Sequence, residues 1–205
     1  MKNLRDYFPE FVMNFLAIFL GVLATLYLTG KITENDERKN LRLQLDALKI
    51  ELNENIKSID EVLTYLERED SVRKYIMSVK SRKQIDVDSL KKYNDIMQVM
   101  QIFTYKKDAY EMLKFTGSMR LINDKQKLLD IMTCYNALEE IKNGFDLISN
   151  YKLSLLNQVL NIDFDFFDLR KPAFTGLYHY FNGYTGIKHG FEMSKKQIEK
   201  TLEKL

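Results

Sequence analysis

The densest group of side chains that could do chemistry lies near the C-terminal end of the sequence. It joins tyrosine hydroxyls to both histidines of the chain and comprises Tyr178, His179, Tyr180, Tyr184 and His189. Histidine titrates near neutral pH, and tyrosine combines an apolar ring with a polar hydroxyl. Such a group is typical of a ligand pocket or of an interface with another surface. The alternative is ordinary core packing of a terminal helix, with the hydroxyls reaching water.

Two other features could also bind or react. Asp163, Asp165 and Asp168 alternate with phenylalanines, but the glycine and later glutamate of a calcium loop are not in place. We expect a loop whose acids face water, and therefore no metal site. Cys134, the single cysteine, sits in an apolar helical stretch. We interpret it as a small buried hydrophobe and not as a nucleophile.

No catalytic constellation accompanies these residues. The sequence contains no phosphate-binding glycine loop, no nucleophile elbow, and too few cysteines and histidines for a structural zinc site. We therefore predict that the protein is not an enzyme and holds no cofactor. A net charge of +2, from 31 basic and 29 acidic residues, gives no electrostatic reason to expect nucleic acid as a partner.

The elements that position these residues are expected to be helices. The chain has only 8 Gly and 2 Pro in 205 residues, and 29% of it is charged, which favours long solvent-facing helices. We predict an all-α fold in which an N-terminal transmembrane helix continues into an antiparallel helical bundle. The expected parts are a tail over 1–10, a membrane helix over 11–30, and a bundle over 31–205 with helices near 34–80, 89–105, 108–116, 124–160 and 176–205.

The membrane helix is the strongest signal. The stretch from Phe11 to Gly30 has no charged residue and spans about 30 Å as a helix, the thickness of a hydrocarbon core. A cleaved signal peptide is the alternative, but its apolar run would be shorter and followed by small residues at a cleavage site. Five basic side chains follow the stretch closely, whereas Lys2 and Arg5 precede it. This asymmetry predicts that the C-terminal domain faces the cytoplasm.

Small and polar residues form a stripe along this helix, namely Asn14, Ala17, Gly21 and Thr25. Small residues let two membrane helices approach closely, and an asparagine amide can bond across the contact. The stripe is a candidate surface for a homo-oligomer in the lipid bilayer. Small residues are also common in membrane helices that do not associate, so both interpretations stay open here.

A Leu-rich helix follows the membrane stretch. Its apolar positions from Leu41 to Leu66 keep a strict four-three spacing, which Asn55 interrupts with a polar side chain. Ile50, Ile56 and Leu63 widen the apolar face beyond that seam. A wide face suits the core of an intramolecular bundle better than a two-stranded coiled coil, although the coiled coil remains the alternative.

The order of these features resembles a bacterial family of single-pass, membrane-anchored helical proteins that carries only a domain-of-unknown-function label. The resemblance rests on four motifs in this order: Tyr110 at the start of a helix, a turn at Thr116-Gly117, the short sequence Leu121-Ile122-Asn123-Asp124, and a Leu-rich helix over 128–135 that ends in a tyrosine. The chain departs from that family just after the anchor. It has Thr29-Gly30-Lys31 there and lacks the tryptophan and the paired asparagines that the family pattern would place at this point. The resemblance implies the bacterial inner membrane and assigns no catalytic residue.

These features together predict a non-catalytic, membrane-anchored interaction or scaffold protein with an unidentified protein partner. Two other classes remain alternatives. One is a ligand-sensing helical domain that uses the aromatic group near the C-terminus. The other is a membrane-acting effector in defence or toxicity, which would depend on residues 1–30.

Overall fold

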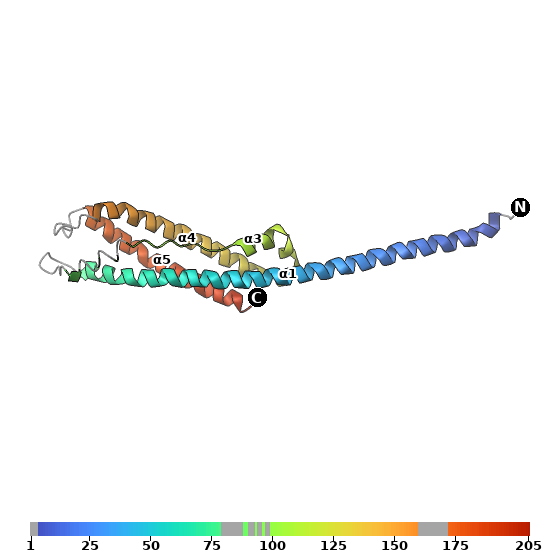
Figure 1. Cartoon of the computed structure of the whole chain (residues 1–205), viewed down its shortest axis with the longest axis horizontal. Helices are drawn as coiled ribbons and strands as arrows, with labels where there is room; N and C mark the ends of the chain where they lie inside the picture. Colours follow the sequence, from blue (N-terminus) through green and yellow to red (C-terminus); the bar gives the residue numbers. More distant parts are fainter. Residues whose placement is uncertain (1–3, 79–87, 90–92, 94–95, 97–98, 160–171) are drawn as a thin grey trace.

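The computed structural model describes residues 4–78, 88–89, 93, 96, 99–159 and 172–205. Every regular element in these ranges is helical, which confirms the predicted all-α class. The elements in chain order are α1 (Leu4–Ser78), α3 (Asp108–Phe115), the 3-10 turn η2 (Ser118–Leu121), α4 (Lys125–Val159) and α5 (Pro172–Leu202) (Figure 1).

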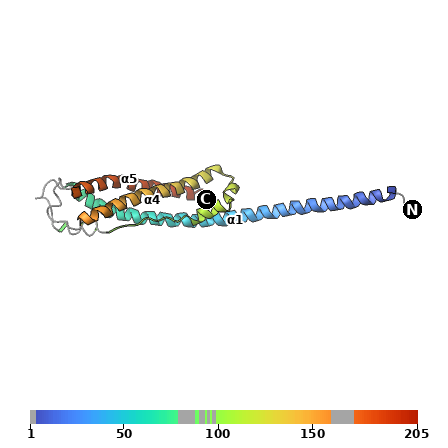
Figure 2. The same cartoon turned by 90° about the horizontal axis from the view of Figure 1, so that it is seen from above.

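The first element is one unbroken helix of 75 residues. It contains both the predicted membrane helix and the predicted Leu-rich helix, and it begins at Leu4 inside the predicted tail. Acidic Asp6 and Glu10 suit the N-terminal end of a helix, which carries partial positive charge. Gly30 costs about 1 kcal/mol relative to alanine, too little to end a helix of this length. The N-terminal half of α1 therefore projects from the bundle as one long, gently curved helix (Figures 1 and 2).

The bundle is built from the second half of α1 together with α4 and α5 (Figure 1). The chain leaves the far end of α1, and an extended stretch returns along the bundle to α3. Then α4 runs in the same direction as α1, away from the projecting N-terminal end, and α5 runs back antiparallel to α4 (Figure 1). The arrangement is the predicted antiparallel bundle, except that residues 99–107, between α1 and α3, are not helical.

The predicted helix over 89–105 is wrong in its second half, because residues 99–107 have no helical structure. The apolar spacing of this stretch is helical, but side chains of other elements bond its backbone directly. Val99 and Lys106 are both held in this way, as described below. We name residues 99–107 the extended segment.

The predicted seam of α1 forms the core. Its members from Leu48 to Leu66 are almost fully buried, and so is the polar Asn55. Aromatic rings from three other elements complete this core: Phe191 lies edge-on to both Phe103 and Phe145.

Glycines let α4 and α5 pack closely. The glycine-rich half of the C-terminal segment is an unbroken part of α5, which starts at Pro172 and not at Gly176 as predicted. Proline is favoured at a helix start because its missing N–H would be unsatisfied there anyway. Three glycines seven residues apart on α5 accept three α4 side chains that are also seven apart. The pairs are Gly176 with Leu155, Gly183 with Ile148, and Gly190 with Ile141.

The glycine seam leads to a matched pair of variants. A Cβ at Gly176 would lie 2.4 Å from Leu155 Cδ2, whereas a Cβ at Gly186 would meet nothing within 4 Å. We expect Gly176→Val to lower the free energy of unfolding by about 1–3 kcal/mol through overpacking. Gly186→Val should leave it unchanged or slightly higher. Denaturant titrations in mild detergent measure both, and equal effects at the two positions would contradict close packing at Gly176.

Candidate functional site

The most deeply buried charges among the described residues belong to Lys152 on α4 and Glu69 on α1. Their side chains are 1% and 0% exposed, and Lys152 Nζ forms an ion pair with Glu69 Oε1. Burying a charge in a protein core is costly unless it is paired and hydrogen-bonded. The pair therefore ties α4 to α1 across the core and leaves neither charge alone.

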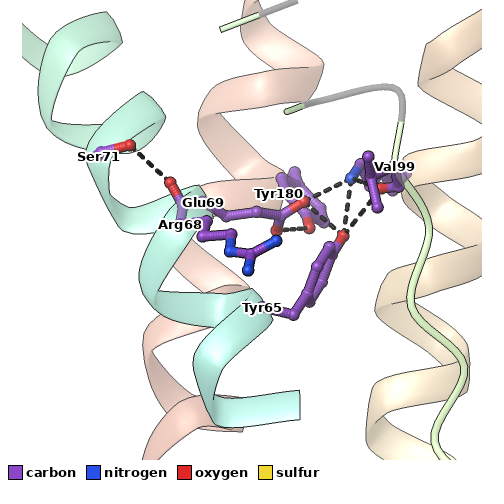
Figure 3. Close-up of polar contacts among 7 residues, drawn as sticks. Tyr65, Arg68, Glu69, Ser71, Val99 and Tyr180 are labelled. Carbon is purple, nitrogen blue, oxygen red and sulfur yellow. Dashed lines mark hydrogen bonds and ion pairs between the residues drawn. The ribbon is translucent and has the colours of Figure 1, made fainter. Parts of the chain in front are cut away.

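Two hydroxyls and one backbone carbonyl complete the surroundings of this pair (Figure 3). Lys152 Nζ also donates to the Tyr65 hydroxyl at 2.7 Å and to the Val99 carbonyl at 2.6 Å. Tyr65 donates to Glu69 Oε1 at 2.5 Å, and Tyr180 of α5 donates to Glu69 Oε2. All three protons of the ammonium group and both carboxylate oxygens are thus used. We call Tyr65, Glu69, Val99, Lys152 and Tyr180 the buried polar cluster.

Burial is the largest influence on the proton affinities in this cluster. It lowers the pKa of Lys152, while the nearby Glu69 carboxylate acts in the opposite direction. Burial also raises the pKa of the Tyr65 and Tyr180 hydroxyls, and the Glu69 charge raises both further. Both tyrosines therefore stay protonated and remain hydrogen-bond donors to the carboxylate.

Tyr184 lies one turn after Tyr180 on α5 and borders the cluster. Among the described residues, its hydroxyl is the one buried side-chain polar atom without a hydrogen-bond partner in the protein. Leaving such a group unpaired costs about 1–3 kcal/mol, and an ordered water molecule is its usual partner.

A second set of polar side chains on α1 holds the extended segment. Asn55 Nδ2 donates to the Lys106 carbonyl at 2.8 Å, and Asn55 Oδ1 accepts the Lys106 N–H at 2.7 Å. One buried amide thus satisfies both backbone groups of the same residue. Because backbone groups away from water need such partners, the extended conformation is stabilised without a neighbouring strand.

Glu51 has the corresponding role at the start of α3. Its carboxylate accepts the N–H groups of Ala109 at 2.7 Å and Tyr110 at 3.3 Å, and also the Tyr135 hydroxyl. The first turn of a helix has N–H groups without intrahelical partners, and negative charge is favourable there. The residue before α3, Lys107, makes no capping hydrogen bond with its side chain. Glu51 therefore caps α3 from a different helix.

The predicted aromatic and imidazole group is divided between two faces of α5. Tyr180 and Tyr184 are buried, whereas His179 is exposed. The side chain of His189 is 72% exposed and lies 3.9 Å from Glu192. The side chain of Tyr178 lies outside the part of the chain that the structure describes. The described members therefore do not converge on one cavity, and the Tyr180 hydroxyl is bonded to Glu69.

The acidic loop with Asp163, Asp165 and Asp168 lies outside the described residues. Within the described ranges, no three His, Cys, Asp or Glu side chains are placed to hold a metal ion together. Cys134 is fully buried, and its Sγ donates to Thr201 Oγ1 at 3.0 Å. This placement agrees with its interpretation as a small core residue.

The predicted association stripe lies on the projecting half of α1. Asn14, Ala17, Gly21 and Thr25 are all exposed there. Thr25 Oγ1 donates to the Gly21 carbonyl at 2.8 Å, so the hydroxyl is satisfied within the helix. A Cβ added at Gly21 would meet nothing within 4 Å. The stripe is therefore open to another helix.

The buried polar cluster was not found from the sequence, although a signal for it exists. Glu69 follows Leu66 at the next position of the apolar seam, and Lys152 lies between Ile148 and Leu155 with the same four-three spacing. Opposite charges at seam positions of two amphipathic helices indicate a buried ion pair. The capping role of Glu51 has no such local signal, because its partners are far away in the sequence.

Comparison of the chain with family models, with curated proteins and with solved structures gives no match. The family resemblance of the sequence therefore stays a prediction, and the site must be interpreted from its own geometry.

The ion pair can be tested with a double-mutant cycle. Lys152→Met leaves Glu69 buried without its charge partner, and we expect it to lower the free energy of unfolding by about 3–5 kcal/mol. Adding Glu69→Gln should recover part of this loss, because no unpaired charge then stays in the core. Denaturant titration of the wild type, the two single variants and the double variant gives the coupling free energy between Lys152 and Glu69. Strictly additive losses would show that the two groups do not depend on each other.

The burial of Cys134 predicts low thiol reactivity. Burial raises the pKa of the Cys134 thiol to about 11 from its ordinary 9.0. The neutral thiol therefore stabilises the fold fully below pH 9, and this contribution is lost as the pH rises towards 11. At pH 8 we expect a disulfide reagent to label the folded protein only through unfolding, and to label it rapidly in denaturant. Fast stoichiometric labelling without denaturant would place the thiol at the surface.

Proposed function

We propose that this chain is a membrane-anchored helical interaction or scaffold protein that performs no catalysis itself. In this proposal the apolar end of α1 sits in a bilayer, and the bundle presents its surfaces to partner proteins. The lipid bilayer is thus its first partner.

The unbroken course of α1 is the observation that carries this proposal. Among the described residues, α1 is the one helix long and apolar enough to cross a membrane. Its apolar side chains from Met13 to Ile32 are exposed on all sides. A continuous apolar surface of this extent is unusual on a protein in water, whereas in lipid a helix satisfies its own backbone.

Rigidity is a second support. No loop separates the apolar end from the core of the bundle, since both belong to the same helix. A protein that only needed a tether could use a flexible linker. A continuous helix instead fixes the distance and the orientation of the bundle relative to the bilayer.

The use of the buried charges also supports a non-catalytic role. Glu51 caps α3, and Glu69 and Lys152 join three helices and the extended segment. These groups are fully engaged in holding the bundle together. Catalytic acids and bases are instead usually poised in a cleft, where they can meet a substrate.

The proposed location is the inner membrane of a bacterium, with the bundle on the cytoplasmic side. It rests on the family resemblance and on the basic residues that follow the span, among them Lys31, Arg38 and Arg42. The lone buried cysteine is compatible with a reducing compartment.

Membrane extraction tests the anchor. We expect the full chain to stay in the pellet after alkaline carbonate treatment, and a chain without residues 1–30 to be released, because only the former holds an apolar span. A reporter fused after Leu205 that is active only in the cytoplasm tests the orientation. Release of the full chain by carbonate would refute the anchor, and an inactive reporter would refute the orientation alone.

A further inference from the structure

We propose that the partner of this chain is a second copy of itself, aligned in parallel along one face of α1 that continues from the membrane stripe onto the bundle. The proposal rests on the proposed membrane anchor, which orients both copies in the same direction. The contact outside the membrane would be formed by Leu43 and Ile50 of α1, flanked by Met112 and Phe115 of α3. We call these four residues the outer patch.

The helical phase connects the two surfaces. At 3.6 residues per turn, Leu43 lies about six turns after Gly21, and Ile50 lies about eight turns after it. Both therefore return to the face of α1 that carries the small residues of the stripe. Leu48 follows Gly21 by about seven and a half turns, which places it on the opposite face. Leu48 is indeed fully buried in the bundle.

The outer patch is exposed although it is apolar. Leu43 and Ile50 are 59% and 64% exposed, and Phe115 at the end of α3 is 97% exposed. A shallow hollow between α1 and α3 is lined in part by Ala47, Ile50 and Met112, which places Ile50 and Met112 of the patch side by side. Clustered exposed apolar residues of this kind are typical of protein contact surfaces. The bundle lies on the other side of α1, so a second copy can approach without displacing it.

Charges beside this face favour a parallel pair of identical chains. Lys31 and Lys49 lie on one flank of the face, and Asp36 and Glu54 lie on the other. In a parallel pair each flank meets the opposite flank of the partner, whereas in an antiparallel pair like flanks would meet. Each acid follows its lysine by five positions, the spacing of g and e positions that form ion pairs between parallel helices. Glu54 also binds Lys106 within the chain, at an exposed site open to a second cation.

A lipid surface does not fit the outer patch. Leu43 lies about 18 Å beyond Lys31 along the helix, and the headgroup layer is only about 5–8 Å deep on each side. A second protein helix at this height is therefore the matching occupant.

Two charged residues, Lys39 and Asp46, also lie on this face and would meet their own copies across the symmetry axis. Because like charges repel, this part of the face adds little to the affinity. The stripe in the membrane therefore supplies most of the affinity of the dimer, and the outer patch sets the register of the two helices.

Disulfide cross-linking in membranes tests this contact. In a Cys134→Ala background, we expect Ile50→Cys to form a disulfide-linked dimer under mild oxidation of native membranes. Leu147→Cys is the matched control, because Leu147 is 72% exposed on α4 but lies away from the proposed face. Cross-linking at both positions to the same extent would mean crowding instead of a specific contact, and would overturn the proposal.

Variants of the stripe separate a true interface from chance collision. Gly21→Leu should lower the dimerisation constant at least about tenfold, because bulk at the stripe keeps the helices apart. Leu23→Phe adds bulk to the opposite face of the same helix and should leave dimerisation unchanged. Leu43→Glu combined with Phe115→Glu should reduce cross-linking at Ile50→Cys without unfolding, since both side chains are exposed. Equal effects of Gly21→Leu and Leu23→Phe would overturn the proposal.

Carbonate extraction of the same membranes separates the two proposals. A chain that resists extraction but shows no cross-link at Ile50→Cys would refute the dimer and leave the anchor intact. A chain that carbonate releases would refute the anchor, and with it the parallel alignment on which the dimer depends.

Discussion

Polar groups buried along α1 need partners, and that need decides where much of the chain runs. Asn55 takes both backbone groups of Lys106, Glu51 takes the first N–H groups of α3, and Glu69 takes Lys152 together with two hydroxyls. A core filled only with leucine would bury more apolar surface but would not select among alternative packings. Each polar side chain instead admits one placement of the element that it bonds. The extended segment, α3 and α4 are positioned by these bonds as much as by apolar packing.

The helices could be predicted from the sequence because their signals are local. The charge-free stretch, the four-three spacing after Leu41 and the Gly117 turn after α3 each depend on residues close together in the chain. Gly117 does adopt the left-handed conformation, with φ 69°, that glycine favours. The extended segment could not be predicted in this way. Its apolar spacing is helical, and the interactions that override it come from Asn55 and Lys152, about fifty residues away in either direction.

The candidate site was predicted less well than the fold, also for a physical reason. The aromatic and imidazole group is compact in sequence, but a helix turns neighbouring residues to different sides. Tyr180 and Tyr184, four residues apart, are both buried, while the neighbouring His179 is exposed. Lys152 and Glu69 lie far apart in sequence and meet only after folding. The role of the α5 glycines could not be predicted for a similar reason. Their close packing against Leu155 and Ile148 depends on a partner helix that the local sequence does not reveal.

The continuity of α1 also gives the molecule reach. With its apolar end in a bilayer and its axis upright, the helix would carry Ser78 about 70 Å above the hydrocarbon boundary near Gly30. The far end of the bundle would then stand clear of the headgroups and of most small peripheral proteins. A tilt of a few degrees in the lipid would displace that end by several ångströms, because no hinge along α1 absorbs the motion. The distance between the far end of the bundle and the membrane surface would thus depend directly on the thickness of the bilayer and on the tilt of α1.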